Sequence, residues 1–348
     1  MLPRNNEPPI SPSRTSSFAE ALRDSLARRR PLLDRRQTEA VRVLAAESDG
    51  FPGVFVDVYG PGAVLIAYEG RAPRYFDPTT ETRAALQMLA PLGVRAVYFK
   101  PFAKDRSKMG GELPPVVTDP APAAGEPQPE FLLVREHDWK LEIRLYDGLS
   151  TGLFLDQRDY RRFVADWVRQ RANSKGKPPA VLNTFAYTCA FSVAAAIAGA
   201  TTASVDVSPR YLDWGKRNFE HNHLDPAHHR FARMDTFEFL AYAKRKGLKF
   251  DLIILDPPSF ASGNKKKGIR PWSSIADYSR LVREAAALLE PQGVLFASTN
   301  TQELCRPGRL EHEITKGLGH TPRWLRLPDM PLDFARDRER FSARAFVV

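Results

Sequence analysis

The chain has 348 residues, enough for two domains, and its 43% apolar and 26% charged content is typical of a soluble globular protein. It has no apolar stretch of membrane-spanning length and no secretory signal, and its two cysteines are too few for a disulfide framework or a cysteine zinc site, so we expect a cytoplasmic protein without membrane or metal partners. The net charge of +10 favours a polyanionic partner, most simply a nucleic acid.

Residues 1–37 form the first predicted segment. The first part is rich in Pro, Asn, Ser and Arg, and we expect a mobile arm. Ser17 and Glu20 have the spacing of a capping box, which predicts a helix from Phe18 to about Arg29. Its basic end suits the helix dipole, and could equally contact phosphates.

Residues 38–147 predict a small α+β domain, which we interpret as RNA-binding. Short apolar segments separated by turns are typical of strands, and one segment has helical composition. The expected strands are 41–44, 54–58, 63–66 and 96–99, with a helix at 79–89 and a hairpin over 132–145.

After Gly148 the pattern changes to alternating strands and helices. The expected strands are 180–182, 203–206, 230–233, 250–255 and 294–297, followed by an antiparallel pair, 324–327 with 343–348. Such alternation specifies a parallel sheet flanked by helices, with right-handed crossovers that place the carboxyl ends of the strands on one rim. The predicted fold class is therefore α/β, with a Rossmann-like sheet over residues 148–348.

Three acidic residues stand at consecutive strand ends: Asp206, Asp235 and Asp256. A carboxylate after the second strand can accept both hydroxyls of a ribose, and Asp235 could accept an adenine amine. The helix that follows the first strand offers N–H groups to a carboxylate. The pattern predicts an adenosine-containing cofactor. Each acid alone could instead be a helix cap, as Asp235 before Thr236.

The turn after the first strand argues against a dinucleotide. The Gly-x-Gly-x-x-Gly fingerprint is absent, and Phe185, Tyr187 and Phe191 would obstruct a pyrophosphate. No phosphate-binding Gly-x-x-x-x-Gly-Lys-Ser/Thr loop occurs either. A cofactor without phosphates, bearing a sulfonium and an amino-acid tail, fits better.

The segment from Asp256 to Phe260 carries the most chemical information. An acid, two prolines and an aromatic follow a strand of the predicted sheet, where ligands of open α/β sheets bind. Pro257 and Pro258 lack N–H groups, which stiffens the turn and leaves carbonyl acceptors facing outward. Phe260 offers a flat face to a planar substrate. An ordinary Asp-Pro turn is the alternative reading.

These residues resemble the class I S-adenosylmethionine-dependent methyltransferases, and more narrowly the bacterial enzymes that methylate 23S ribosomal RNA. The similar segments are 151–158, 183–188, Asp206 with the helix 212–222, and 256–260, together with 47–53 in the small domain. The rim and the resemblance together imply a cofactor site formed by Gln157, Arg158, Asn183, Phe185, Tyr187, Thr188, Asp206, Asp235, Thr236 and Asp256. The resemblance implies that Asp256, Pro257, Pro258 and Phe260 are catalytic.

The chain departs from that family at two positions. Cys189 replaces a glycine, which we expect to narrow the room beside the methionine tail. Asn300 stands where the relatives that methylate cytosine C5 carry a cysteine. Cytosine C5 needs a thiolate to become nucleophilic, whereas guanine N7 has a lone pair and needs only alignment. We therefore expect methylation of a guanine nitrogen of 23S rRNA, with N7 favoured.

Further residues are candidates for contact with the RNA. A basic cluster after the catalytic segment is either a phosphate clamp or a solvated loop, and the segment 331–336 resembles the guanine-N7 branch of the family. The expected substrate-binding residues are Lys265, Lys266, Lys267, Arg270, Asn300, Phe334 and Arg336. Two alternatives remain open: cytosine-C5 methylation that uses Cys305, and a non-catalytic RNA-binding assembly factor.

Overall fold

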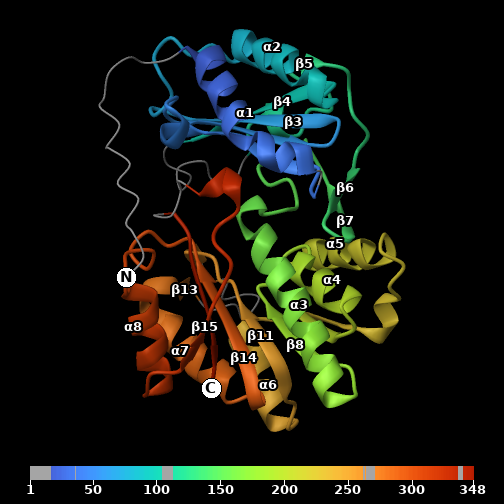
Figure 1. The fold of residues 1–348 in the computed structure, drawn as a ribbon, viewed down its shortest axis with the longest axis vertical. Helices are drawn as coiled ribbons and strands as arrows, with labels where there is room; N and C mark the ends of the chain where they lie inside the picture. Colours follow the sequence, from blue (N-terminus) through green and yellow to red (C-terminus); the bar gives the residue numbers. More distant parts are fainter. Residues whose placement is uncertain (1–16, 36, 104–112, 262, 264–270, 336–339) are drawn as a thin grey trace.

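A computed structural model describes residues 17–35, 37–103, 113–261, 263, 271–335 and 340–348. Two units lie one above the other along the long axis of the molecule (Figure 1). No helix of the described residues has the length and apolar character needed to cross a membrane. The N-terminal unit carries a small sheet, and the C-terminal unit carries the larger sheet and the site described below.

The N-terminal sheet has five strands in the order in which they occur along the chain. They are β1 (Ala40–Ala45), β2 (Val54–Tyr59), β3 (Gly62–Tyr68), β4 (Ala96–Phe102) and β5 (Ala124–Gly125). Neighbouring strands are antiparallel except β3 and β4, which are parallel. Two helices, α1 (Phe18–Arg35) and α2 (Pro78–Leu89), contribute to one core beside these strands.

Helix α1 is part of this unit. Phe18 and Leu22 are buried in the same core as Val41 and Val54. The expected division at residue 37, between a basic helix and the small domain, is therefore wrong for the described residues, and the helix runs to Arg35 rather than Arg29. The capping box is present, because the Ser17 backbone N–H donates to the Glu20 carboxylate at 2.9 Å. The mobile arm expected before Ser17 lies outside the described residues.

A hairpin joins the two units. Strands β6 (Leu132–Glu136) and β7 (Trp139–Ile143) pair with each other and share a buried core with Tyr59 and Val64 of the small sheet. Asn218, in helix α5 (Pro209–Glu220), accepts a hydrogen bond from the backbone of β7. The hairpin, expected within the small domain, thus contacts both units.

The C-terminal sheet has seven strands in the spatial order β10-β9-β8-β11-β14-β16-β15. They are β8 (Ala180–Thr184), β9 (Thr201–Asp206), β10 (Arg230–Arg233), β11 (Phe250–Leu255), β14 (Leu289–Thr299), β15 (Arg323–Leu325) and β16 (Ser342–Val347). The strands from β10 to β14 are parallel, and β16 is antiparallel to both its neighbours. The predicted α/β class with a Rossmann-like sheet is confirmed.

Helices cover both faces of this sheet. Buried residues of α3 (Arg158–Lys175) and α4 (Ala190–Ile197) pack on one face, and those of α6 (Thr236–Arg245), α7 (Ser274–Ala286) and α8 (Arg309–Leu318) on the other. The helices α3 and α8 were not expected from the sequence. In α3, a single buried stripe of Tyr160, Val164 and Val168 is set among many charged residues, which dilute the apolar signal.

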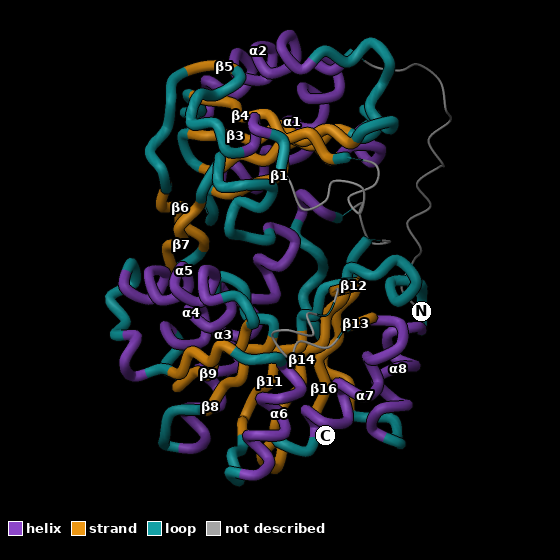
Figure 2. Tube along the Cα trace, turned by 180° about the vertical axis from the view of Figure 1, so that it is seen from behind, coloured by secondary structure: helices purple, strands orange, loops and turns teal. Residues whose placement is uncertain are grey.

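The strand order creates a topological switch point between β8 and β11. From β8 the chain moves outward to β9 and β10, and it then returns to β11 on the other side of β8. Open α/β sheets bind their ligands beyond the carboxyl ends of the strands at such a point. A short pair, β12 (Phe260–Ala261) with β13 (Trp272–Ser273), lies near this rim (Figure 2).

Candidate functional site

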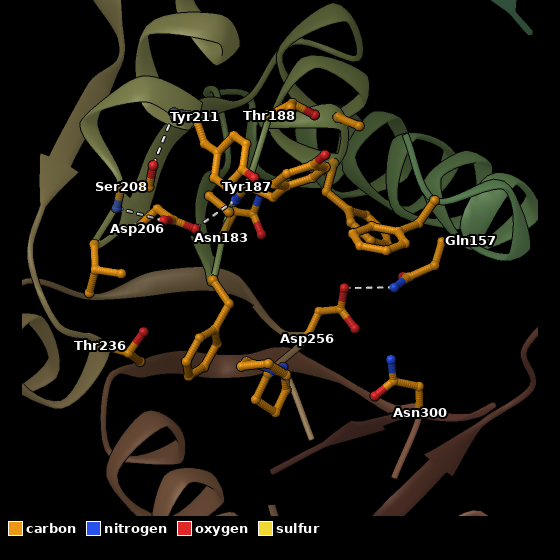
Figure 3. A pocket seen from close by; sticks show the side chains of 18 of the residues that line it. Gln157, Asn183, Tyr187, Thr188, Asp206, Ser208, Tyr211, Thr236, Asp256 and Asn300 are labelled. Carbon is orange, nitrogen blue, oxygen red and sulfur yellow. Dashed lines mark hydrogen bonds between the residues drawn. The ribbon is translucent and has the colours of Figure 1, made fainter. Parts of the chain in front are cut away.

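A cavity of about 640 Å³ opens at the switch point. Its volume is in the range of small-molecule sites. Thirteen of the residues expected to act here line it: Gln157, Asn183, Phe185, Tyr187, Thr188, Asp206, Asp235, Thr236, Asp256, Pro257, Pro258, Phe260 and Asn300. Figure 3 shows Asp206, Ser208 and Tyr211 at one end of it, and Gln157, Asp256 and Asn300 at the other.

Asp206 fixes the first end of the cavity. Its Oδ2 accepts the backbone N–H of Tyr187 at 2.9 Å, and its Oδ1 accepts that of Ser208 at 2.8 Å (Figure 3). Burial raises the pKa of the carboxyl above its usual value, and the backbone hydrogen bonds act in the opposite direction. The carboxylate thus connects the turn after β8 to the turn after β9 and still lines the cavity.

The turn after β8 has an unusual backbone. Phe185, Tyr187 and Cys189 all adopt positive φ angles of 54°, 50° and 62°. Thr188 holds the turn against the neighbouring segment, since its hydroxyl donates to the Gly152 carbonyl at 2.7 Å. Non-glycine residues in this conformation are uncommon and are found where surrounding contacts impose it.

Cys189 does not narrow the cavity. The residue is fully buried and is absent from the lining, and its side chain would clash with a Cβ added to Gly215 of α5. The side chain therefore occupies space that a glycine leaves free. The expectation that it crowds the methionine tail is wrong, because its sulfur contacts α5.

Asp235 combines both readings that the sequence left open. Its Oδ1 accepts the backbone N–H groups of Phe237 at 2.9 Å and Glu238 at 3.4 Å, which caps α6. The same residue also lines the cavity with Thr236. The helix cap orients a carboxylate that is available at the cavity wall.

Asp256 is held from two sides. Its Oδ1 accepts the Ser298 hydroxyl and its Oδ2 accepts the Gln157 amide, both at 2.6 Å. Burial raises the pKa of Asp256, while these two donors act to lower it. Each carboxylate oxygen is thus already engaged in one hydrogen bond before any ligand is considered.

The carbonyl of Pro258 does not face outward as the sequence led us to expect. The carbonyl of Pro258 accepts the Trp272 indole N–H at 2.6 Å and the Ser274 hydroxyl at 2.9 Å, so it is used inside the protein and does not face outward. Phe260 is 67% exposed and lines the cavity, which leaves its ring accessible to a ligand. Asn300 accepts the Ser259 hydroxyl on Oδ1 at 2.7 Å.

Two expected site residues lie elsewhere. Arg158 is 1% exposed and forms a bidentate ion pair with Asp333, so it is not a cofactor ligand here. Phe334 is 5% exposed and packs under the guanidinium of Arg42 at 4.7 Å, which prevents it from stacking on a base. Both residues belong to the junction of the two units.

Other expectations concern residues outside this cavity. Cys305 does not line it, and burial raises the pKa of its thiol to about 11, which opposes a nucleophilic role. Five expected phosphate or substrate contacts lie outside the described residues: Lys265, Lys266, Lys267, Arg270 and Arg336.

Sequence reasoning missed several lining residues. The most prominent are Phe154, Asp156, Tyr211, Trp272 and Phe341. Phe154 and Asp156 lie in the segment 151–158, which resembles a family motif. From that segment only Gln157 and Arg158 were assigned to the site. Trp272 and Phe341 lie outside every motif recognised in the sequence, and no local pattern indicates that they line a site.

The charge of the cavity lining distinguishes a cofactor with a pyrophosphate from one with a sulfonium group. Among the described residues, the charged members of the lining are Asp156, Asp206, Asp235, Asp256 and one arginine, Arg161, which is paired with Glu136 at 2.6 Å. A negative cavity disfavours a pyrophosphate and suits a cofactor with a sulfonium charge. The residues present therefore fit S-adenosylmethionine.

The sheet order and a negative cavity at its switch point define a Rossmann-like enzyme with a nucleoside cofactor. The family described as S-adenosylmethionine-dependent methyltransferase matches residues 120–321. The chain belongs to this family, and S-adenosylmethionine is its cofactor.

Similar proteins extend the comparison. A Bacillus subtilis protein, YwbD, provisionally named a ribosomal RNA large subunit methyltransferase, is 37% identical over 82% of this chain and 66% of its own length. Ribosomal RNA large subunit methyltransferase I of Klebsiella pneumoniae strain 342 is 35% identical, with 80% and 64% covered. The K/L enzyme of Psychrobacter arcticus is 34% identical over 81% of this chain and 35% of its own length.

A solved structure is also similar. SMU.776, provisionally described as a methyltransferase and solved with SAH, has a TM-score of 0.80 and 32% identity, over 97% of this chain and 84% of its own. The present chain spans between about one third and two thirds of the length of the three named relatives.

Proposed function

We propose that this methyltransferase modifies a guanine at N7 in 23S ribosomal RNA. The observation that carries the choice of atom is the substrate end of the cavity, where Asn300 lines the wall and no cysteine does among the described residues. Cytosine C5 requires a thiolate, and guanine N7 does not. The three relatives described above are named as methyltransferases of large-subunit ribosomal RNA, which supports the choice of RNA.

The first end of the cavity would hold the cofactor. Asp206 would accept the ribose hydroxyls and Asp235 the adenine amine, with Thr236 beside it. The methionine half would lie against the turn after β8 and beside Gln157. The residues of that turn proposed to form this wall are Asn183, Phe185, Tyr187 and Thr188.

The other end would hold the target base. Asp256, Pro257 and Pro258 would form one wall, and the exposed ring of Phe260 would stack on the base or on its neighbour. Bound S-adenosylmethionine supplies an electrophilic methyl group on sulfur. Guanine N7 carries a lone pair and no proton, so the protein has only to align it. An Asp256 whose two oxygens are already hydrogen-bonded suits a reaction that needs no general base.

The RNA would approach from the side of the N-terminal unit as well. The net charge of +10 favours a polyanion, and Arg23, Arg28 and Arg30 on α1 are exposed. A base inside a duplex must leave its stack to enter the cavity, at a cost of a few kcal/mol. The small sheet would provide backbone contacts that offset this cost.

The test is to map modifications in 23S RNA from a strain that lacks the gene. N7-methylguanosine is detected because borohydride followed by aniline cleaves the chain at that nucleotide. One cleavage should disappear, return with the wild-type gene and stay absent with Asp256→Ala, whose product should remain folded. Loss of a cytosine-C5 mark instead, with a covalent adduct on 5-fluorocytosine RNA, would support the alternative reaction.

A further inference from the structure

We propose that Asn218 is a positioning residue for the cofactor, because its side-chain amide fixes the backbone of the turn after β8. The inference rests on the proposed function, which places the methionine half of S-adenosylmethionine against that turn. Asn218 lies in the segment 212–222, which resembles a family motif. The side chain is fully buried and does not line the cavity, so it acts on the ligand through other residues.

The amide of Asn218 bridges two elements. Its Oδ1 accepts the backbone N–H of Glu142 in β7 at 2.8 Å, and its Nδ2 donates to the Thr188 carbonyl at 2.9 Å. A backbone N–H only donates and a carbonyl only accepts, so the two partners fix which end of the amide faces each of them. Asn218 therefore holds the hairpin with its oxygen and the turn after β8 with its nitrogen.

Two neighbouring residues of α5 bind the hairpin but not the turn. Trp214 and Asn222 stand four positions before and after Asn218, which places the three side chains on one face of the helix. The Trp214 indole donates to the Glu142 carbonyl at 3.2 Å. The Asn222 amide donates to the Lys140 carbonyl at 2.7 Å and accepts the Lys140 N–H at 2.8 Å. Of these three side chains, only that of Asn218 forms a hydrogen bond with the turn in the described part of the chain.

The turn needs such an anchor because its backbone is strained. Tyr187 and Cys189, on either side of Thr188, have positive φ angles of 50° and 62°, which non-glycine residues keep only where surrounding contacts impose them. Rotation of the peptide group between Thr188 and Cys189 would return Cys189 to a negative φ angle and relieve part of this strain. Two bonds oppose that rotation: the Asn218 amide holds the carbonyl, and the Ala186 carbonyl accepts the Cys189 N–H at 2.8 Å.

The orientation of this peptide determines where helix α4 begins. Cys189 is the N-cap of α4, and Ala190 and Phe191 in the first turn of that helix line the cavity. The free N–H groups at a helix N-terminus favour a carboxylate, and the amino-acid tail of the cofactor carries one. Asn218 thus acts on the cofactor through the turn and the first residues of α4.

The first test compares Asn218→Asp with Asn222→Asp. Aspartate has nearly the shape of asparagine, and when ionised at position 218 it still accepts the Glu142 N–H but no longer donates to Thr188. We expect the calorimetric Kd for S-adenosylmethionine to rise about 10-fold in Asn218→Asp. Asn222→Asp loses a donor to the same hairpin and leaves the turn bonded, so its Kd should stay within about twofold of wild type. Equal rises in the two variants would overturn the inference.

A second ligand separates positioning from a general loss of structure. 5′-Methylthioadenosine has the nucleoside and the thioether of the cofactor but lacks its amino-acid carboxylate. Asn218→Ser is the neutral companion variant, because its side chain is too short to reach both partners and adds no charge. In both variants of Asn218, the Kd for methylthioadenosine should stay within about twofold of wild type while that for S-adenosylmethionine rises. Equal weakening of the two ligands would assign Asn218 a structural role only and overturn the inference.

The same measurements distinguish this inference from the proposed function. An unchanged Kd for S-adenosylmethionine in both variants of Asn218, with a raised Kd in Asp206→Ala, would overturn the inference alone. An unchanged Kd in all three variants would also refute the proposed placement of the cofactor. A raised Kd in both variants of Asn218, with no N7-methylguanosine in the wild-type RNA, would support the positioning role and refute the proposed reaction.

Discussion

Replacing Arg158 by methionine should destabilise the protein strongly and leave cofactor binding unchanged. The guanidinium donates to Asp333 at 3.0 and 2.9 Å and to the Ala40 carbonyl at 2.8 Å, and both charged side chains are at most 1% exposed. After the substitution, the Asp333 carboxylate keeps, among the described residues, only the hydrogen bond from the backbone N–H of Arg42, at 3.0 Å, and remains a buried charge. Breaking such a pair costs about 3–5 kcal/mol.

Thermal unfolding followed by circular dichroism would measure the effect, and we expect the Tm to fall by at least about 5 °C. Arg169→Met is the control. Arg169 lies on the same helix and forms an ion pair, but its side chain is 37% exposed, so its loss should change the Tm little. The double variant Arg158→Met/Asp333→Leu should recover most of the loss, since it removes both charges. An unchanged Tm with a raised Kd for S-adenosylmethionine would refute the reasoning and restore the role predicted from the sequence.

Three further predictions follow from the site and the junction. Cys305→Ser should retain methyl transfer within about twofold, because the thiol lies outside the cavity; a loss of activity would favour the cytosine reaction. Asp206→Ala should raise the calorimetric Kd for S-adenosylmethionine about 10- to 100-fold, through loss of charge-assisted hydrogen bonds; an unchanged Kd would exclude the ribose contact. Burial acts to raise the pKa of Asp49, but the charge and hydrogen bond of Arg29, with hydrogen bonds from Arg28 and the Ala45 backbone, together lower the pKa below its usual value. The stabilisation that comes from this lowered pKa is present above about pH 4 and is lost as the pH falls through the pKa of Asp49 in the folded protein. Arg29→Met should therefore shift acid unfolding to higher pH.

The sequence predicted that residues at several strand ends line one cavity, because the signals for those residues are local. Asp206 and Asp256 each follow a short apolar segment, and the strands that carry them are parallel. Their carboxyl ends must then share one rim. Asp235, Asp206 and Asp256 do line one cavity, which was the expectation on which the functional argument depended.

The junction of the two units could not be predicted in the same way. Arg158 and its partner Asp333 are separated by 175 positions, and nothing near either residue signals the other. Because Arg158 is a polar residue in a segment that resembles a family motif, it was predicted to contact the cofactor. In the structure it is buried at the junction with the N-terminal unit. Phe334 was assigned to the substrate for the same reason, because an aromatic side chain near a predicted site could stack on a base or fill a core.

Cys189 and Gly215 share a single space, and this has an evolutionary consequence. A Cβ at position 215 would clash with the Cβ and sulfur of Cys189. The two sites are therefore epistatic: alanine at 215 is excluded while cysteine occupies 189, and becomes acceptable once 189 has mutated to glycine. Starting from cysteine at 189 and glycine at 215, an exchange to glycine and alanine avoids the clash only if position 189 changes first.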